Sequence, residues 1–311
     1  MTELLEHTVE TYTAADGYVL HYRHWRPQET PKARVVCVHG IQSHSGWYLY
    51  SSSRLCAAEY EVFYLDRRGS GLNEQDRGHA KNFHVLIDDL VLFLGRVRAQ
   101  EPRRPVVLSG VSWGGKLVVA VAKDHPKLID ALVLLCPGLF PKVGVPPLEK
   151  VRIALSRVFA RYRRFTIPLT DPELFTANPK WLEFLRTDPL SLHRATASML
   201  VASARLDWYL RDAPEKIHTP ALLFLAGQDR IIDNERTRRY FERFRSPNKR
   251  VIEYPDAHHT LEFEPDPDPF IDDWIQWLDE VVGTRGGDSH GVPAAQSPDA
   301  TSHPEPDSAD G

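Results

Sequence analysis

Residues 105–124 read PVVLSGVSWGGKLVVAVAKD, and the hydrophobic pattern changes in the middle of this stretch. The first part is a short apolar run typical of a buried strand, and the last part has helical spacing. Between them, Gly110 to Gly114 form the pentapeptide G-x-S-x-G. On a sharp turn from strand to helix, only glycine at the flanking positions avoids a Cβ clash, so Ser112 is expected to stand on a strained turn above a sheet.

The same stretch nearly fits a phosphate-binding loop, since Gly110, Gly115 and Lys116 match G-x-x-x-x-G-K. Leu117, however, stands where a Ser or Thr would hold Mg²⁺, and no apolar strand ending in Asp is dedicated to that metal. A lone G-x-S-x-G pentapeptide also arises by chance in loops. The interpretation of Ser112 as a nucleophile therefore depends on partners that follow in the right order.

A serine hydroxyl needs an imidazole to take its proton and a carboxylate to orient that imidazole, in the chain order Ser, Asp or Glu, His. The strand-like run PALLFLAGQD ends at Asp229, and the run KRVIEYPDA leads into His258 and His259. Asp233 is a rival for the acid, but it precedes a helical pattern, which favours an N-cap. Spacing alone does not decide between the two histidines.

An oxyanion hole is expected after the strand-like run RVVCV, at His39 and Gly40. A His-Gly turn there lets a backbone N–H group face the serine. We predict the N–H groups of Ile41 and Trp113 as the two donors. His39 itself is interpreted as a structural hydrogen-bonding residue.

The rest of the chain alternates strand and helix signals. Predicted strands cover 18–25, 33–40, 60–66, 105–112, 129–137, 220–229 and 249–257. Helical patterns lie at 84–100, 113–125, 233–244 and 269–282. This alternation predicts an α/β fold with a mostly parallel central sheet and helices on both faces.

The alternation stops at residues 138–219, which contain helix-like segments and Pro-bounded turns but no convincing strand. We predict a helical lid here, inserted into a core formed by 1–137 and 220–283, because ligands of such sheets bind beyond the carboxyl ends of the strands. Residues 284–311 are rich in Gly, Pro, Ser and Asp and contain no aromatic residue. We expect them to form a disordered acidic tail.

The composition is that of a globular protein: 311 residues, 42% of them hydrophobic, with 42 acidic against 38 basic side chains. This balance argues against nucleic acid as the main partner. Cys37, Cys56 and Cys136 have no CxxC spacing, so neither a disulfide scaffold nor a cysteine zinc site is expected. The chain begins without a signal-like segment and contains no apolar run of spanning length, which predicts a cytoplasmic protein.

Six motifs occur in order: VCVHGIQSHSGWY, YLDRRGSG, GVSWGG, TDPL, AGQDRIID and YPDAHHTLEFE. Together they resemble the α/β-hydrolase branch that contains monoglyceride lipases, lysophospholipase-like proteins and serine aminopeptidase-like hydrolases. The base of that branch lies two residues before a leucine, which implies His259. Its oxyanion loop usually reads H-G-x-G-E-H, whereas this chain has Gln42 and Ser43 at the fourth and fifth positions. The resemblance gives Asp66 and the following glycine turn a structural role.

The resemblance implies a serine hydrolase that cleaves carboxylic esters through an acyl-enzyme, without cofactor or metal. The expected substrates are lipid-like, of the monoacylglycerol or lysophospholipid type. Two alternatives stay open at this point. One is a peptidase or acyltransferase with the same three residues, and the other is a non-catalytic binding protein of the same fold.

Residues 148–165, LEKVRIALSRVFARYRRF, carry six basic side chains against Glu149. The basic side chains are Lys150, Arg152, Arg157, Arg161, Arg163 and Arg164. Apolar residues recur at helical spacing, namely Val151, Leu155, Val158, Phe159 and Tyr162. We expect a lid helix with its apolar side turned inward, and the alternative is transient contact with an anionic lipid surface. A basic lid favours ester over aminopeptide substrates.

Overall fold

The computed structural model describes residues 4–286. The predicted tail lies outside this range except for residues 284–286, which continue the last helix. The strands are β1 (Thr8–Thr13), β2 (Val19–Trp25), β3 (Ala33–Val38), β4 (Tyr60–Leu65), β5 (Val106–Val111), β6 (Ala131–Leu135), β7 (Arg164–Thr166), β8 (Arg194–Thr196), β9 (Ala221–Ala226) and β10 (Lys249–Tyr254). The helices are α1 (Leu49–Ala57), α2 (Phe83–Gln100), α3 (Gly114–Asp124), α4 (Pro147–Phe159), α5 (Pro179–Thr187), α6 (Ala197–Tyr209), α7 (Asn234–Glu242) and α8 (Asp268–Gly286).

Among the described residues, one eight-stranded sheet has the order β1-β2-β4-β3-β5-β6-β9-β10. The pairs of β2 with β1 and with β4 are antiparallel, and the other pairs are parallel. The chain moves outward from β3 to β4 and then returns to the other side of β3 as β5. The loops after β3 and β5 therefore meet at a topological switch point, where such sheets bind ligands.

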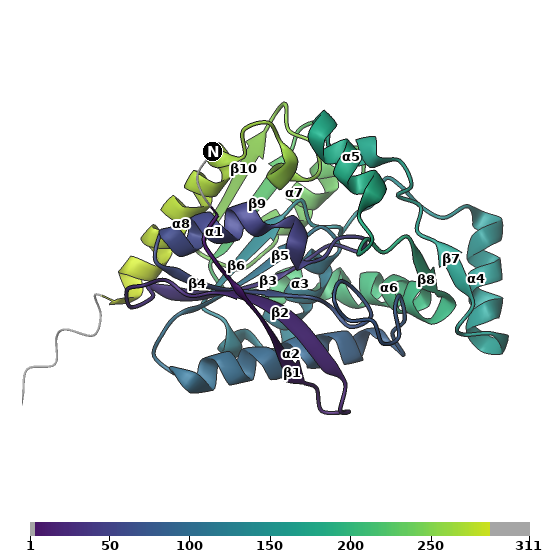
Figure 1. Cartoon of the computed structure of the whole chain (residues 1–311), viewed down its shortest axis with the longest axis horizontal. Coiled ribbons are helices and arrows are strands. Elements are labelled where there is room, and N and C mark those ends of the chain that lie inside the picture. Colours follow the sequence, from purple (N-terminus) through teal and green to yellow (C-terminus); the bar gives the residue numbers. More distant parts are fainter. Residues whose placement is uncertain (1–3, 287–311) are drawn as a thin grey trace, which may run out of the picture.

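The sheet is covered on both faces. Every residue of β3, β4, β5, β6 and β9 is buried, which explains why these segments are apolar with little alternation. Helices α1 and α8 pack together above the sheet in Figure 1, whereas α2, which contacts α3, lies below it. The predicted mostly parallel sheet with helices on both faces is confirmed.

Four elements differ from the sequence prediction. Strand β1 and helix α1 were not predicted, because β1 has few apolar residues and α1 contains the serine run Ser51 to Ser53. Strands β7 and β8 form an antiparallel pair within residues 138–219. The expectation that this segment contains no strand is therefore wrong. Each of these two strands is only three residues long, which is too short for a periodic signal.

Between β6 and β9 the chain builds α4, β7, α5, β8 and α6, which lie together on the right of Figure 1. We call residues 138–219 the cap. Helix α4 packs on α6, and α6 in turn contacts α2, one of the helices that cover the sheet. The cap is thus anchored to the core through α6, with α4 on its outer side.

The orientation of α4 corrects a second expectation. Within this helix only Ile153 and Ser156 are buried. The apolar side chains predicted to point inward are exposed instead, with Val158 at 73% and Phe159 at 83% exposure. The cause is that the side of the helix with Ile153 and Ser156 faces α6. The opposite side, which carries most of the large apolar residues, therefore has no partner in the described chain.

Candidate active site

The turn at Ser112 has the strained geometry expected from its flanking glycines. Ser112 has φ of +50°, in the left-handed region that few non-glycine residues adopt. A β-carbon at Gly110 would lie 2.5 Å from Val118 Cγ2, and one at Gly114 would lie 2.4 Å from the Val38 carbonyl oxygen. Both positions therefore require glycine, because β5, α3 and β3 pass too close for any side chain.

Ser112, His259 and Asp229 form one hydrogen-bond chain. His259 Nε2 lies 2.9 Å from Ser112 Oγ, and His259 Nδ1 lies 2.6 Å from Asp229 Oδ2. The other carboxylate oxygen of Asp229 accepts the N–H groups of Ile231 and Ile232, at 2.7 and 3.0 Å. Because Nδ1 faces an acceptor, it carries the proton and leaves Nε2 free to take the serine proton.

The rivals considered from the sequence lie elsewhere. The His258 imidazole turns to Glu264, with Nδ1 3.1 Å from Oε1. Asp233 caps α7 by accepting the N–H of Arg236 at 3.0 Å. Lys116, the lysine of the phosphate-loop pattern, is buried and pairs with Asp207 of α6. Within the described chain, none of these three side chains forms a hydrogen bond or an ion pair with Ser112, whose hydroxyl contacts His259.

The predicted oxyanion donors lie at the switch point beside Ser112. The N–H groups of Ile41 and Trp113 have no acceptor within the described residues. A β-carbon at Gly40 would lie 3.2 Å from Ser112 Cβ, which shows how closely the loop after β3 approaches the serine. Gly138 was not predicted, although a β-carbon there would lie 3.1 Å from the Trp113 nitrogen. Glycine at 138 therefore leaves that donor open.

Arg67 is a further residue of the site that sequence reasoning missed. Its Nη2 donates to the carbonyl oxygens of Gly40 and Ile41 at 2.7 and 3.0 Å, and its guanidinium lies 4.8 Å from the centre of the Trp113 ring. It is buried, and burial lowers its pKa to about 10. Arg67 thus contacts both residues whose N–H groups are the predicted oxyanion donors, Ile41 and Trp113. Its signal in the sequence was a pair of arginines directly after a buried strand.

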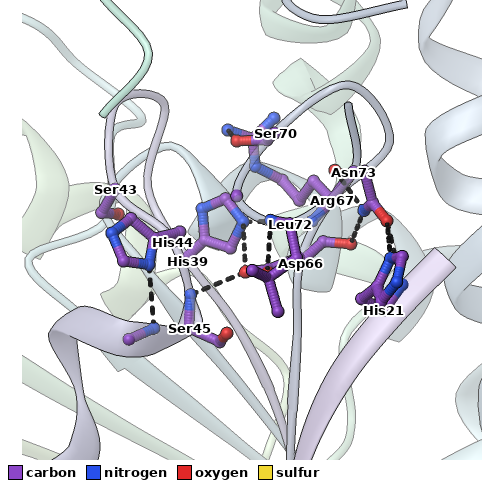
Figure 2. Close-up of polar contacts among 12 residues, drawn as sticks. His21, His39, Ser43, His44, Ser45, Asp66, Arg67, Ser70, Leu72 and Asn73 are labelled. Carbon is purple, nitrogen blue, oxygen red and sulfur yellow. Dashed lines mark hydrogen bonds and ion pairs between the residues drawn. The ribbon is translucent and has the colours of Figure 1, made fainter. Parts of the chain in front are cut away.

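His39 supports the same loop as a neutral residue. Its Nε2 accepts the Arg67 N–H at 3.0 Å and its Nδ1 donates to the Gly40 carbonyl at 2.8 Å. Burial and the nearby Arg67 hold the pKa of His39 well below its usual range. The 3.8 Å approach to Asp66 is therefore not an ion pair. Figure 2 shows this approach together with the two hydrogen bonds that Asp66 accepts from the N–H groups of Ser45 and Leu72, which fit its predicted structural role.

Gln42, one of the two departures from the family loop, ties the oxyanion loop to the cap. Its backbone oxygen accepts the Leu192 N–H at 2.9 Å, and its side-chain amide donates to the Leu169 carbonyl at 3.0 Å. Ser43, the other departure, accepts the Tyr48 hydroxyl at 3.2 Å. The missing glycine is thus replaced by a residue with two cap contacts.

A buried carboxylate fastens the cap next to this loop. Asp188, directly after α5, accepts hydrogen bonds from His44 at 3.0 Å, Trp47 at 2.9 Å and Ser191 at 2.7 Å. Burial alone would raise the pKa of Asp188, but these hydrogen bonds hold it well below its usual range. The carboxylate is therefore charged at neutral pH and holds the cap to the core.

The serine opens into a cavity of about 570 Å³ between core and cap. Ser112, Ile41, Trp113 and Gly138 line it on the core side. Its apolar walls include Val143, Val145, Ile153, Ala154, Ile167, Pro168, Leu169, Leu200, Val201, Ala204, Trp208, Ile231 and Ile232. The charged residues of the lining are Lys116, Lys150, Arg205 and Asp207.

Cys136 lies beside the hydrogen-bonded residues. Its sulfur and ligand atoms of Asp229 and His259 lie within 4.8 Å of one another, which is a spacing that can suit a metal ion. Burial and the neighbouring Asp229, however, hold the pKa of the thiol well above its usual range. His259 Nδ1 and Asp229 Oδ2 also lie only 2.6 Å apart, which is hydrogen-bond distance and leaves no space for an ion between these two atoms. The arrangement is therefore a hydrogen-bonded Asp-His pair with a neutral thiol beside it.

Known proteins share this architecture. The structure of a monoacylglycerol lipase from Paleococcus ferrophilus aligns with a TM-score of 0.76 at 24% identity, covering 84% of this chain and 99% of that one. A soluble variant of monoglyceride lipase from Saccharomyces cerevisiae, solved with a substrate analog, gives a TM-score of 0.78 at 20% identity over 90% and 97%. Together with the sheet and the turn at Ser112, these define the α/β-hydrolase fold.

The sequence comparisons place the chain within that fold. The family model described as serine aminopeptidase, S33 matches residues 29–266, so the chain belongs to this family of hydrolases. Human monoglyceride lipase is 28% identical over 252 residues, covering 80% of this chain and 82% of the relative. The monoacylglycerol lipase of Mycolicibacterium smegmatis is 25% identical over 270 residues, covering 86% and 95%. The predicted monoglyceride lipase-like branch is confirmed.

Proposed function

We propose that this protein is a serine hydrolase of carboxylic esters with a lipid-like acyl chain. The observation that carries the proposal is the hydrogen-bond chain from Ser112 through His259 to Asp229, which ends at a largely apolar cavity. Relatives named monoglyceride lipase and monoacylglycerol lipase support the ester class. Monoacylglycerols and lysophospholipids, each with one acyl chain, are the proposed substrates.

The proposed reaction has two halves. Ser112 Oγ attacks the ester carbonyl while His259 Nε2 takes the hydroxyl proton, and the oxyanion receives the N–H groups of Ile41 and Trp113. The imidazolium returns its proton to the leaving alcohol, and the acyl group stays on Ser112. Water then attacks the acyl-enzyme with His259 as base, and the fatty acid and free serine result. Throughout, Asp229 stabilises the imidazolium.

Peptidase and acyltransferase activities use the same three residues. An aminopeptidase needs an acidic group to hold a free amino terminus, but the cavity offers only Asp207, which is already paired with Lys116. The remaining charged lining residues, Lys150 and Arg205, are cations and would repel the protonated amino terminus of a peptide. Ester substrates therefore fit the cavity better. Product analysis with water and alcohol acceptors separates hydrolysis from acyl transfer.

We also propose that the cap is a lid whose outer helix contacts lipid surfaces transiently. Its exposed apolar row lies among basic side chains, a combination suited to the interface of an anionic bilayer. The exposed residues are Leu148, Val151, Leu155, Val158, Phe159 and Tyr162. No helix within residues 4–286 is both long and apolar enough to cross a bilayer.

The direct test is covalent labelling by a fluorophosphonate, followed by mass spectrometry of the modified peptide. Ser112 is expected to carry the label, and Ser112→Ala is expected to abolish it. Hydrolysis of monoacylglycerols with graded acyl lengths then defines the chain that the cavity prefers. Labelling of another serine, or unchanged turnover by Ser112→Ala, would refute the mechanism.

A further inference from the structure

A second hollow of about 430 Å³ lies beside the active-site cavity, outside the hydrogen-bond chain of Ser112. Its lining comes from the segment after β6, from the end of α6 and the turn that follows it, and from α7 and the residue after it. Three arginines line it: Arg211, Arg236 and Arg243. We call this hollow the arginine cleft, and none of its arginines had a role in the sequence predictions.

The positive charge of the cleft is only partly compensated within the described chain. Arg243 pairs with Glu215, and the one acidic residue of the lining, Asp207, pairs with Lys116. Arg236 makes only a ring contact with its guanidinium, 4.6 Å from the centre of the Phe140 ring.

Arg211 has no ion-pair or hydrogen-bond partner among residues 4–286. Together with Arg236 it leaves two guanidinium groups whose donors are open. Planar guanidinium donors suit phosphate oxygens, which can accept two hydrogen bonds from one arginine.

The cleft adjoins the active-site cavity. The two hollows share Pro141, Ala204, Asp207 and Trp208 in their linings. Pro141, Ala204 and Trp208 are exposed, so the shared boundary of the two hollows, which we call the rim, is accessible to solvent.

Helix α6 contributes residues to the linings of both hollows, so it shows how they lie relative to each other. Its residues Leu200 and Val201 line the apolar side of the cavity near α4, and Asp207 and Trp208 mark the rim of the cleft. Ser203, between these two groups, accepts the indole N–H of Trp113 at 2.8 Å. The turn that carries Ser112 thus faces the middle of α6, with an apolar region to one side and the cleft to the other.

We infer that the arginine cleft is a subsite for the phosphate group of a monoacyl phospholipid whose ester bond lies at Ser112. The acyl chain occupies the apolar side of the cavity, and the phosphate of the alcohol part reaches Arg211 and Arg236. This inference rests on the proposed ester hydrolysis and narrows its substrate class, since a neutral monoacylglycerol leaves both guanidinium groups without a partner.

The test compares two monomeric substrates with one decanoyl chain, 1-decanoylglycerol and 1-decanoylglycerol 3-phosphate. We expect kcat/KM to be about tenfold higher for the phosphate, as charge-assisted hydrogen bonds at a partly exposed site imply. The double variant Arg211→Gln/Arg236→Gln should bring the ratio close to one. Arg239→Gln is the matched control, because Arg239 lies on α7, pairs with Glu235 and is absent from the cleft lining.

A second pair of variants separates the cleft from the basic residues of the active-site cavity. If Lys150→Gln/Arg205→Gln abolishes the phosphate preference while the cleft variant keeps it, the inference is wrong. A parent ratio near one, with Ser112 still labelled by a fluorophosphonate, also overturns it but leaves the proposed function intact. Absence of both labelling and hydrolysis contradicts the proposed function itself.

Inorganic phosphate distinguishes a substrate subsite from a site for free anions. Phosphate should inhibit hydrolysis of the phosphate ester in the parent more strongly than in the double variant, at matched ionic strength. If phosphate raises the thermal midpoint of the parent alone, yet the two esters react equally, the cleft binds free anions and the substrate role is refuted.

Discussion

Helices α3 and α4 show how differently the core and the cap are built. In α3, nine of the residues Gly114–Asp124 are buried, and the turn before it is confined by backbone on several sides. In α4, two of the residues Pro147–Phe159 are buried, and a row of large apolar side chains faces outward. The turn that carries Ser112 is thus fixed by packing on all sides, whereas the outer helix of the cap has few packing partners in the described chain. Under the proposed function, the core therefore sets the geometry of the reaction and the cap controls which substrates reach it.

The largest effect is expected inside the core, at the proposed base. His259→Ala should lower kcat by about 10⁶-fold, because loss of one member disables the whole chain of Ser112, His259 and Asp229. His258→Ala should change kcat only mildly, since its imidazole faces Glu264. Steady-state kinetics of the two variants on one ester test the assignment of His259 as the base. An inactive His258 variant beside an active His259 variant would contradict it.

Two glycine-to-alanine substitutions compare how tightly the core and the cap are packed. Gly114→Ala should reduce the free energy of unfolding by about 3 kcal/mol or more, the upper end of overpacking costs. The reason is that its β-carbon would lie 2.4 Å from the Val38 carbonyl oxygen, whereas one at Gly144 would have nothing within 4 Å. Gly144→Ala should therefore be close to neutral. Denaturant unfolding measures both, and equal losses would contradict the contrast.

Two buried carboxyls respond to pH in opposite directions. Burial raises the pKa of Glu262 in the core to about 7, although it accepts the N–H groups of Tyr50 and Ser51. The folded state therefore keeps this carboxyl protonated to a higher pH than the unfolded chain does. The contribution of Glu262 to the free energy of unfolding is lost as pH rises from about 4.3 towards 7. Asp188, whose pKa is lowered, loses its contribution only in acid.

Glu262→Gln should remove the first of these dependences. The variant should gain about 1–3 kcal/mol over the parent between pH 5 and pH 8, as linkage requires. Glu242→Gln, at an exposed position of α7, serves as the control and should follow the parent. Denaturant unfolding at the two pH values measures the change. Parallel curves for parent and Glu262→Gln would show that the proton is not held in the folded state.

The contact between core and cap can be loosened at Gln42. Gln42→Ala removes the hydrogen bond to Leu169 and should lower kcat by about 3- to 30-fold, less than the 10²–10³-fold cost of deleting an oxyanion donor. The effect should fall on kcat more than on KM, because the loop is displaced while the cavity remains. Gln276→Ala on α8 is the control. A change in KM alone would show that Gln42 acts only through the cap.

The smallest effect on turnover is expected on the outside of α4. Replacing Leu155, Val158 and Phe159 by Ser should change hydrolysis of a short soluble ester by less than about twofold, because these side chains do not line the cavity. Binding to anionic vesicles should weaken, and the remaining binding should fall with added salt. Parent protein that never binds anionic vesicles would contradict the proposed lipid contact.

Local steric requirements let the sequence predict the centre of the site. An apolar strand, G-x-S-x-G and an apolar helix permit one kind of turn, because only glycine fits where β5 and α3 pass each other. The uniformly apolar runs likewise indicated a sheet covered on both faces. Asp229 followed from chain order alone, and the resemblance to a known branch selected His259 where spacing did not.

Contacts between distant segments decided the rest. Helix α1 begins where Glu262 accepts the N–H groups of Tyr50 and Ser51, and that contact is invisible in the local pattern of a serine-rich segment. The role of Arg67 depends on the loop after β3, and the outward face of α4 depends on what α6 offers it. Period and spacing report which residues share a face, but the direction of that face is set by the partners that the tertiary structure supplies.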